Sequence, residues 1–215
     1  MGGAQGANNT IDRMRVGSHD ADNKSGVAVI RGLILAAALL VAHSTAHAAS
    51  LDGVSMPDSR EVNGVRTQLN GIGLRTFSLL GIRVYIAGLY LEHRSSNPDE
   101  ILRSPGIKLV DMRFLRDVDA EDARKAWREG FERNCKAPCH LDRYDMQQFL
   151  RAIPTVREGD ECSFLFTSRG VHVSLNKVPV GDIPDPRFAE LILGTFIGAV
   201  PPTPRLKREL LGLRD

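Results

Sequence analysis

The pattern of apolar and polar positions is clearest between residues 65 and 92. Strand-forming residues dominate here, and residues 65–80 (VRTQLNGIGLRTFSLL) predict two strands joined by a turn at Asn70-Gly71. Residues 82–92 (IRVYIAGLYLE) have apolar side chains on both faces, which predicts a central strand. The preceding residues 49–63 are polar and rich in turn formers, so we expect an irregular lead there.

The rest of the chain mixes helical and strand patterns. A strand is predicted over residues 106–118, and a hairpin over residues 158–181 turns near Ser168–Gly170. Helical periodicity and capping residues predict five helices, over residues 95–104, 119–135, 141–153, 185–200 and 203–213. Strands and helices come in groups and do not alternate one by one. This order predicts an α+β fold with a largely antiparallel sheet and helices packed on one face.

The N-terminal part of the chain has a different character. Residues 1–26 are small and polar and predict a disordered lead. Residues 27–48 combine Arg31, a short apolar run and the small-x-small sequence Ala46-His47-Ala48, which is the pattern of a secretory signal peptide. The apolar run is shorter than the roughly 20 residues of a membrane-spanning helix. We therefore expect cleavage after Ala48, a periplasmic or secreted location, no stable membrane span after cleavage, and one domain over residues 49–215. An uncleaved anchor is the alternative.

Composition and motifs mainly exclude functions. The 215 residues include 28 basic and 26 acidic side chains, without a basic stripe that carries interleaved aromatic residues, so we expect no nucleic-acid partner. A P-loop, a Gly-x-Ser-x-Gly elbow and a His-Glu-x-x-His motif are absent. The histidines after residue 48 are His93, His140 and His172, and their wide separation leaves no visible general base. We expect no cofactor.

The three cysteines all lie in the predicted exported domain, where disulfides persist. Cys135 and Cys139 are four residues apart, and Pro138 between them favours a break in the helix that lets a small disulfide loop close. This pairing leaves Cys162 free in a strand. A metal site is the alternative, but only His140 lies near and no second pair with ligand spacing follows, so we expect no metal.

Arg75 is an unusual residue within the apolar stretch. On a regular strand it shares a face with Phe77, and a guanidinium on an apolar face is costly unless it is paired. One interpretation is a structural arginine that reaches solvent or a protein carboxylate. The other is an anchor for an anion at the bottom of an apolar pocket, because arginine suits a carboxylate or phenolate bidentately. Gly71 and Gly73 would then leave room for a close approach.

The segment Gly71-x-Gly73-x-Arg75, followed by GLYLE at residues 88–92, resembles the chalcone isomerase family. The chain is most similar to the bacterial, exported, chalcone-isomerase-like group, and the resemblance covers roughly residues 55–213. Further support comes from RDVDAEDARKAWREGFERNC at 116–135 and GTFIG at 194–198. The resemblance implies the family's open-faced sandwich, in which helices cover one face of an antiparallel sheet.

The resemblance also implies roles for individual residues. In the plant isomerases an arginine stabilises negative charge while a phenolate closes a ring on its own enone. That arginine corresponds to Arg75, the substrate-holding asparagine to Asn134, and a second Thr/Ser to Thr195. Tyr85 and Trp127 stand where the family has a threonine and a tyrosine near the reacting centre. In fatty-acid-binding relatives the arginine and a tyrosine form a carboxylate clamp, a role that suits Arg75 and Tyr85.

Three functions are consistent with these observations. The first is binding of a small apolar anion, such as a fatty acid or a phenolic compound, by Arg75, Tyr85, Trp127, Asn134 and Thr195. The second is an isomerase, an intramolecular lyase that cyclises a phenolic enone such as a chalcone, with Arg75 and Tyr85 as its catalytic residues. The third is an envelope scaffold without a ligand. We favour binding, because the positions nearest the reacting centre are changed.

Structural roles stay open for the same residues. Aromatic residues in positions like those of Tyr85 and Trp127 are more often core residues than ligand contacts. Asn134 is suited to cap its helix, and Thr195 to donate to a carbonyl of its own helix.

Overall fold

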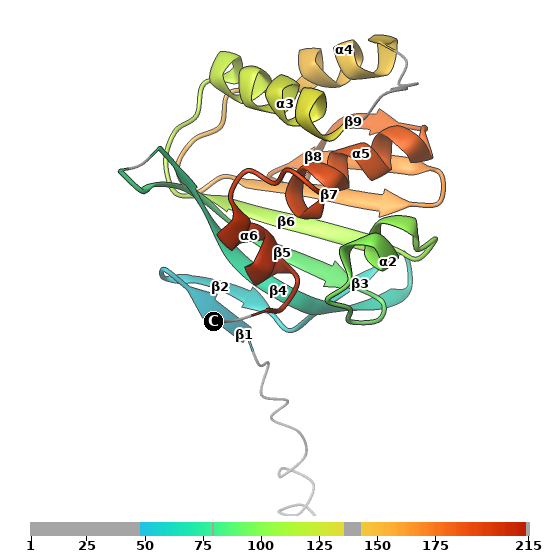
Figure 1. Cartoon of the computed structure of the whole chain (residues 1–215). Coiled ribbons are helices and arrows are strands. Elements are labelled where there is room, and N and C mark those ends of the chain that lie inside the picture. Colours follow the sequence, from blue (N-terminus) through green and yellow to red (C-terminus); the bar gives the residue numbers. More distant parts are fainter. Residues whose placement is uncertain (1–47, 79, 136–142, 214–215) are drawn as a thin grey trace, which may run out of the picture. The chain divides into compact units, whose positions relative to one another are not determined.

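A seven-stranded antiparallel sheet is the framework of the molecule (Figure 1). The structure is a computed structural model that describes residues 48–78, 80–135 and 143–213. Strands follow one another in chain order across the sheet, each antiparallel to its neighbours. They are β3 (Ser59–Val62), β4 (Val65–Phe77), β5 (Ile82–Leu91), β6 (Lys108–Phe114), β7 (Glu161–Thr167), β8 (Gly170–Leu175) and β9 (Val178–Ile183). The strands β1 (Ala48–Leu51) and β2 (Val54–Pro57) form a separate hairpin.

The helices gather on one face of this sheet (Figure 1). They are α2 (Pro98–Arg103), α3 (Ala120–Asn134), α4 (Arg143–Ala152), α5 (Pro186–Ile197) and α6 (Pro204–Leu210). This arrangement confirms the predicted α+β class. None of the described helices is long and apolar enough to cross a membrane.

The sheet is buried on both faces, because side chains of its central strands alternate between two apolar clusters. Ala87 and Leu89 of β5 point into the larger cluster between sheet and helices. Ile86 and Tyr90 point into a smaller one on the other face, which the β1–β2 hairpin covers. This explains why the sequence of β5 is apolar on both faces and confirms its central position. Helix α5 has eight buried residues, six of which belong to the larger cluster, and burial of a large apolar side chain stabilises by roughly 1.5–3 kcal/mol.

The predicted turn at Asn70-Gly71 is wrong. Strand β4 runs through it without reversal, with a register shift against β5 between Leu69 and Gly71. The Asn70 amide donates to the carbonyls of Ser95 and Leu210, and its oxygen accepts from the Ser95 N–H. Partners distant in sequence therefore satisfy a residue whose local pattern predicts a turn, and the strand continues through a bulge.

The predicted irregular lead over residues 49–63 is also wrong, because it contains β1, β2 and β3. Its turn formers mark tight connections between strands. Asp52-Gly53 and Asn63-Gly64 both adopt the positive φ values of two-residue hairpin turns. The hairpin predicted over residues 158–181 likewise contains a third strand, since Asn176-Lys177 turn the chain into β9.

The N-terminal predictions fall largely beyond the described residues. The lead (1–26) and the signal peptide (27–48) lie outside them, except for Ala48, which begins β1. Cys139 also lies outside, so the Cys135–Cys139 pairing stays a prediction. Cys162 is a free cysteine on β7, as expected.

Candidate functional site

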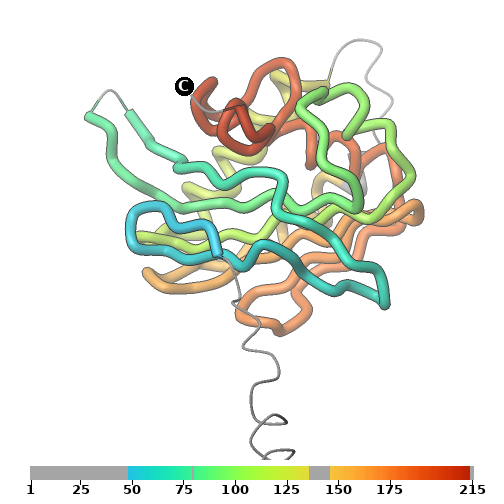
Figure 2. The backbone as a smooth tube through the Cα atoms, turned by 90° about the horizontal axis from the view of Figure 1, so that it is seen from below, coloured from blue at the N-terminus to red at the C-terminus, as the bar shows by residue number. Residues whose placement is uncertain are grey.

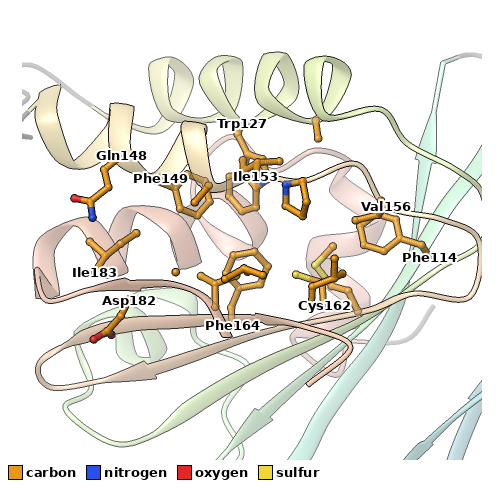
Figure 3. Close-up of a pocket in the computed structure, with 18 residues that line it drawn as sticks. Phe114, Trp127, Gln148, Phe149, Ile153, Val156, Cys162, Phe164, Asp182 and Ile183 are labelled. Carbon is orange, nitrogen blue, oxygen red and sulfur yellow. The ribbon is translucent and has the colours of Figure 1, made fainter. Parts of the chain in front are cut away.

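A cavity of about 140 Å³ lies between helices α3 and α4 and the sheet strands β6 to β9 (Figure 3). Most of the side chains that line it are apolar, and the aromatic ones are Phe114, Trp127, Phe149 and Phe164. Small-molecule sites in proteins have this character, an apolar wall with few polar groups.

Trp127 forms part of the cavity wall and also the centre of an aromatic cluster. Its ring centroid lies 5.0–5.7 Å from those of Phe131, Phe149, Phe164 and Phe196. These rings come from α3, α4, α5 and β7, so Trp127 joins three helices to the sheet. Tilted and edge-to-face contacts of this kind stabilise by about 0.5–1.5 kcal/mol each beyond the buried area. Trp127 is thus a core aromatic residue that a ligand in the cavity would also touch.

The two ends of the cavity differ in polarity. Gln148 of α4 and Asp182 of β9 are exposed and stand at one end, where the Asp182 carboxylate points away from the cavity (Figure 3). Phe114, Val156 and Cys162 stand at the other end (Figure 3). The end near Gln148 therefore carries exposed polar side chains, whereas the end near Phe114, called the inner end below, is apolar.

Cys162 is an inert part of the inner end. Burial raises the pKa of its thiol to about 12, so the thiol stays protonated at neutral pH. A neutral buried thiol packs as a small apolar group and is a poor nucleophile. Within the described part of the chain, no group of three His, Cys, Asp or Glu side chains could hold a metal ion.

Arg75 and Tyr85 lie beside this inner end. The register of β4 and β5 places them directly opposite each other. The Tyr85 ring packs edge-to-face on Phe114, with centroids 5.7 Å apart, so Tyr85 contacts a residue of the cavity wall. Burial raises the pKa of Tyr85 to about 12, although the positive charge of Arg75 opposes the shift. The Tyr85 hydroxyl is therefore a protonated hydrogen-bond donor at neutral pH.

Arg75 contacts neutral acceptors. Its guanidinium donates to the backbone carbonyl of Pro202, at 3.2 Å, and to that of Thr76. None of the ion pairs among the described residues includes Arg75. Arg75 is therefore a half-buried cation. Its hydrogen bonds go to neutral carbonyls, so no carboxylate among the described ion pairs balances its charge.

The space beside Gly71 and Gly73 is filled by helix α6. A Cβ atom at Gly71 would lie 2.0 Å from the Glu209 carbonyl oxygen, and one at Gly73 would lie 2.9 Å from the Glu209 Cβ. These glycines allow α6 to approach β4 closely, so the idea that they leave room for a ligand is wrong. The Glu209 carboxylate also accepts from the Leu74 N–H on this strand.

Asn134 and Thr195 lie away from the cavity wall. The Asn134 amide donates to the Gly130 and Val200 carbonyls, both at 2.9 Å, and its oxygen accepts from the Val200 N–H. The Thr195 hydroxyl donates to the Ile192 carbonyl at 2.7 Å. Both side chains have the structural partners that suit their residue types, and their contact with a ligand stays a prediction.

Only Trp127 of the five proposed ligand-binding residues therefore lines the cavity, while Tyr85 contacts Phe114 of the wall and Arg75 lies opposite Tyr85 on β4. Sequence reasoning missed most of the wall, including Met112, Phe149 and Phe164. Their alternation along strands and helices indicated burial, but the same pattern describes a filled core and a cavity wall alike.

Comparison with known proteins agrees with this architecture. The family model described as chalcone isomerase-like matches residues 48–212, which is more than half of the chain. The chain belongs to the chalcone isomerase-like family. The resemblance noted in the sequence is thereby confirmed, and the described strands and helices all lie within the matched residues.

A solved structure with the same fold is a fatty-acid binding protein from Arabidopsis thaliana. It matches with a TM-score of 0.65 and 18% sequence identity, over 77% of this chain and 96% of that one. This likeness confirms the chalcone isomerase-like fold. No curated protein matches the chain.

Proposed function

We propose that this protein binds a small apolar anion, such as a fatty acid. The observation that carries the proposal is the apolar cavity whose inner end, at Phe114, adjoins Tyr85 and Arg75. The apolar part of the ligand would occupy the cavity against Trp127 and Phe164. Its anionic group would lie beyond Phe114, between Arg75 and Tyr85.

The chemistry of these two side chains suits an anion. Arg75 donates to carbonyls and has no carboxylate among its described ion-pair partners. Tyr85 is protonated at neutral pH, and burial raises its pKa further, to about 12, so its hydroxyl would donate to a bound carboxylate as well. A bound carboxylate would receive charge-assisted hydrogen bonds in a site largely shielded from water, where such bonds are strong.

The size of the cavity sets a condition on the ligand. An apolar cavity of about 150 Å³ holds a group the size of benzene. A long acyl chain would therefore have to extend beyond the cavity, past the exposed Gln148, and the Phe114 ring would turn aside to let the anionic group reach Arg75. The Arabidopsis protein of the same fold is named as a fatty-acid binding protein, which supports an acyl chain as the apolar part.

The test is a calorimetric titration with a fatty acid and with the fatty alcohol of equal length. Arg75→Ala should weaken fatty-acid binding about tenfold or more and leave alcohol binding nearly unchanged, because charge-assisted bonds contribute about 1.5–3 kcal/mol. Arg83→Ala is the matched control, since Arg83 is an exposed arginine on β5 that pairs with Asp52 at 3.3 Å. Equal fatty-acid affinity in the Arg75 variant would refute the anchor.

We further propose that the domain works after export, with a disulfide between Cys135 and Cys139. The apolar run and the Ala46-His47-Ala48 sequence support cleavage before the domain, and an exported protein keeps disulfides. N-terminal sequencing of protein from the envelope of an exporting host should give Ala49 as the first residue. Peptide mapping without reductant should find the two cysteines joined; a chain that still carries residues 27–48 contradicts cleavage after Ala48.

A further inference from the structure

The end of the β4–β5 hairpin exposes two large apolar side chains. Phe77 is 61% exposed and Leu80 is 86% exposed, the highest value among the large apolar residues that the structure describes as exposed. In Figures 1 and 2 this hairpin end projects beyond the neighbouring strands and helices. A single exposed apolar residue is ordinary, but two at one projecting point indicate a contact site.

The same hairpin is positively charged. Between Glu61 and Glu92 the chain has no acidic residue and three arginines, Arg66, Arg75 and Arg83. Arg75 and Arg83 flank the exposed end, one on each strand. Arg83 pairs with Asp52, but its side chain is 62% exposed. Ion pairs at the surface contribute little to stability. The apolar end is thus bordered by cationic side chains.

We propose that this hairpin end docks the protein onto the surface of an anionic phospholipid membrane. Phe77 and Leu80 enter the boundary between headgroups and acyl chains, and Arg83 meets the lipid phosphates. The exposed apolar surface of these two side chains is too small for a stable protein interface. An aromatic side chain buries 150–250 Å², whereas a stable protein interface takes about 800 Å² from each side. A bilayer requires no complementary shape, only apolar side chains and positive charge.

The docking surface is separate from the cavity and does not depend on its ligand. It lies, however, at the end of the strands that carry Arg75 and Tyr85. Docking in this orientation brings those two residues close to the lipid headgroups.

Vesicle co-sedimentation tests the proposal. The experiment uses residues 46–215, a unit that contains both apolar clusters, so that the apolar run of residues 32–42 cannot bind the vesicles. Vesicles of phosphatidylcholine mixed with phosphatidylglycerol are compared with vesicles of phosphatidylcholine alone. The variant F77S/L80S removes the apolar end. The matched control is Val178→Ser, because Val178 is 62% exposed on β9, four strands from β5.

The unchanged protein should bind the anionic vesicles more strongly than the neutral ones, and added salt should weaken that binding. The double variant should bind about tenfold more weakly or not at all, whereas Val178→Ser should bind like the unchanged protein. Fatty-acid titration without vesicles should be the same for all three, which separates this proposal from ligand binding. Three results would overturn it: no vesicle binding by the unchanged protein, equal binding by the double variant, or a dimer in sedimentation velocity that the double variant abolishes.

Discussion

The Arg75 guanidinium on β4 donates a hydrogen bond of 3.2 Å to the carbonyl of Pro202, a residue 127 positions further along the chain. The bond ties the strand to the segment that precedes α6. Because a carbonyl is a neutral acceptor, the bond satisfies a donor and leaves the positive charge available. The structural role of Arg75 and its proposed role in binding can therefore be separated by substitution.

Arg75→Gln tests this separation. Glutamine removes the charge and keeps a neutral donor on a shorter side chain, and since one hydrogen bond to a carbonyl contributes only about 0.5–1.5 kcal/mol, the melting temperature should change little. Fatty-acid affinity should fall about tenfold or more, because the charge is gone. Differential scanning calorimetry and titration on the same preparation check both expectations. A folded variant that binds fatty acid like the unchanged protein would contradict the proposal.

Gly71→Ala should destabilise the fold strongly. The added Cβ would lie 2.0 Å and 2.7 Å from the carbonyl oxygens of Glu209 and Leu210, and backbone atoms cannot turn aside. We expect a loss of about 3 kcal/mol or more in urea denaturation, as α6 is forced away from β4. Gly194→Ala is the control: its Cβ meets nothing within 4 Å inside α5, and it should gain up to about 1 kcal/mol. Equal stability of the two variants would disprove the close packing.

Asn134→Ala should lower the stability of the fold without changing ligand binding in the cavity. It removes bonds to the Gly130 and Val200 carbonyls and to the Val200 N–H, which hold the end of α3 against the segment after α5. We expect a loss of about 1–3 kcal/mol, which for a domain of this size lowers the melting temperature by roughly 2–4 °C per kcal/mol. Gln147→Ala, an exposed amide on α4, should have almost no effect. A loss of fatty-acid binding free energy larger than the loss of unfolding free energy would instead give Asn134 a binding role.

Cys162 should resist alkylation in the folded protein. Burial raises the pKa of its thiol from 9.0 to about 12, so iodoacetamide at about pH 9 should label it only after unfolding in urea. The unfolded chain releases the thiol proton from about pH 9, whereas the folded chain keeps it until about pH 12. Stability is therefore complete below pH 9 and should fall as the pH rises through this window. Urea denaturation of Cys162→Ala should show a smaller fall; an identical pH dependence would argue against the raised pKa.

Phe114→Ala should speed ligand uptake. The Phe114 ring lines the cavity and contacts Tyr85, so under the proposed binding mode its removal joins the cavity to the site beside Arg75. We expect a higher association rate for a fatty acid in stopped-flow measurements. Val156→Ala, which also trims the inner end, is the control. Equal rates for Phe114→Ala and the unchanged protein would show that the ring is no barrier.

The sequence by itself determined the class of fold and identified Arg75 as the residue on which the proposed function depends. Residues 82–92 are apolar on both faces, and only a central strand between two apolar layers satisfies that pattern. Arg75 was identified because a charge among strand-forming apolar residues conflicts with its surroundings. Both conclusions depend only on the order of residues along the chain, because the spacing of apolar side chains indicates which side of each strand or helix is buried.

The tertiary structure decided everything that depends on partners distant in the chain. Asn70-Gly71 reads as a turn, but Ser95 and Leu210 bind the Asn70 amide and the strand continues. Gly71 and Gly73 admit α6 where a ligand was expected, and Asn134 holds the Val200 backbone. Which atoms fill the space beside a residue is set by the packing of the whole chain, and no local pattern encodes it.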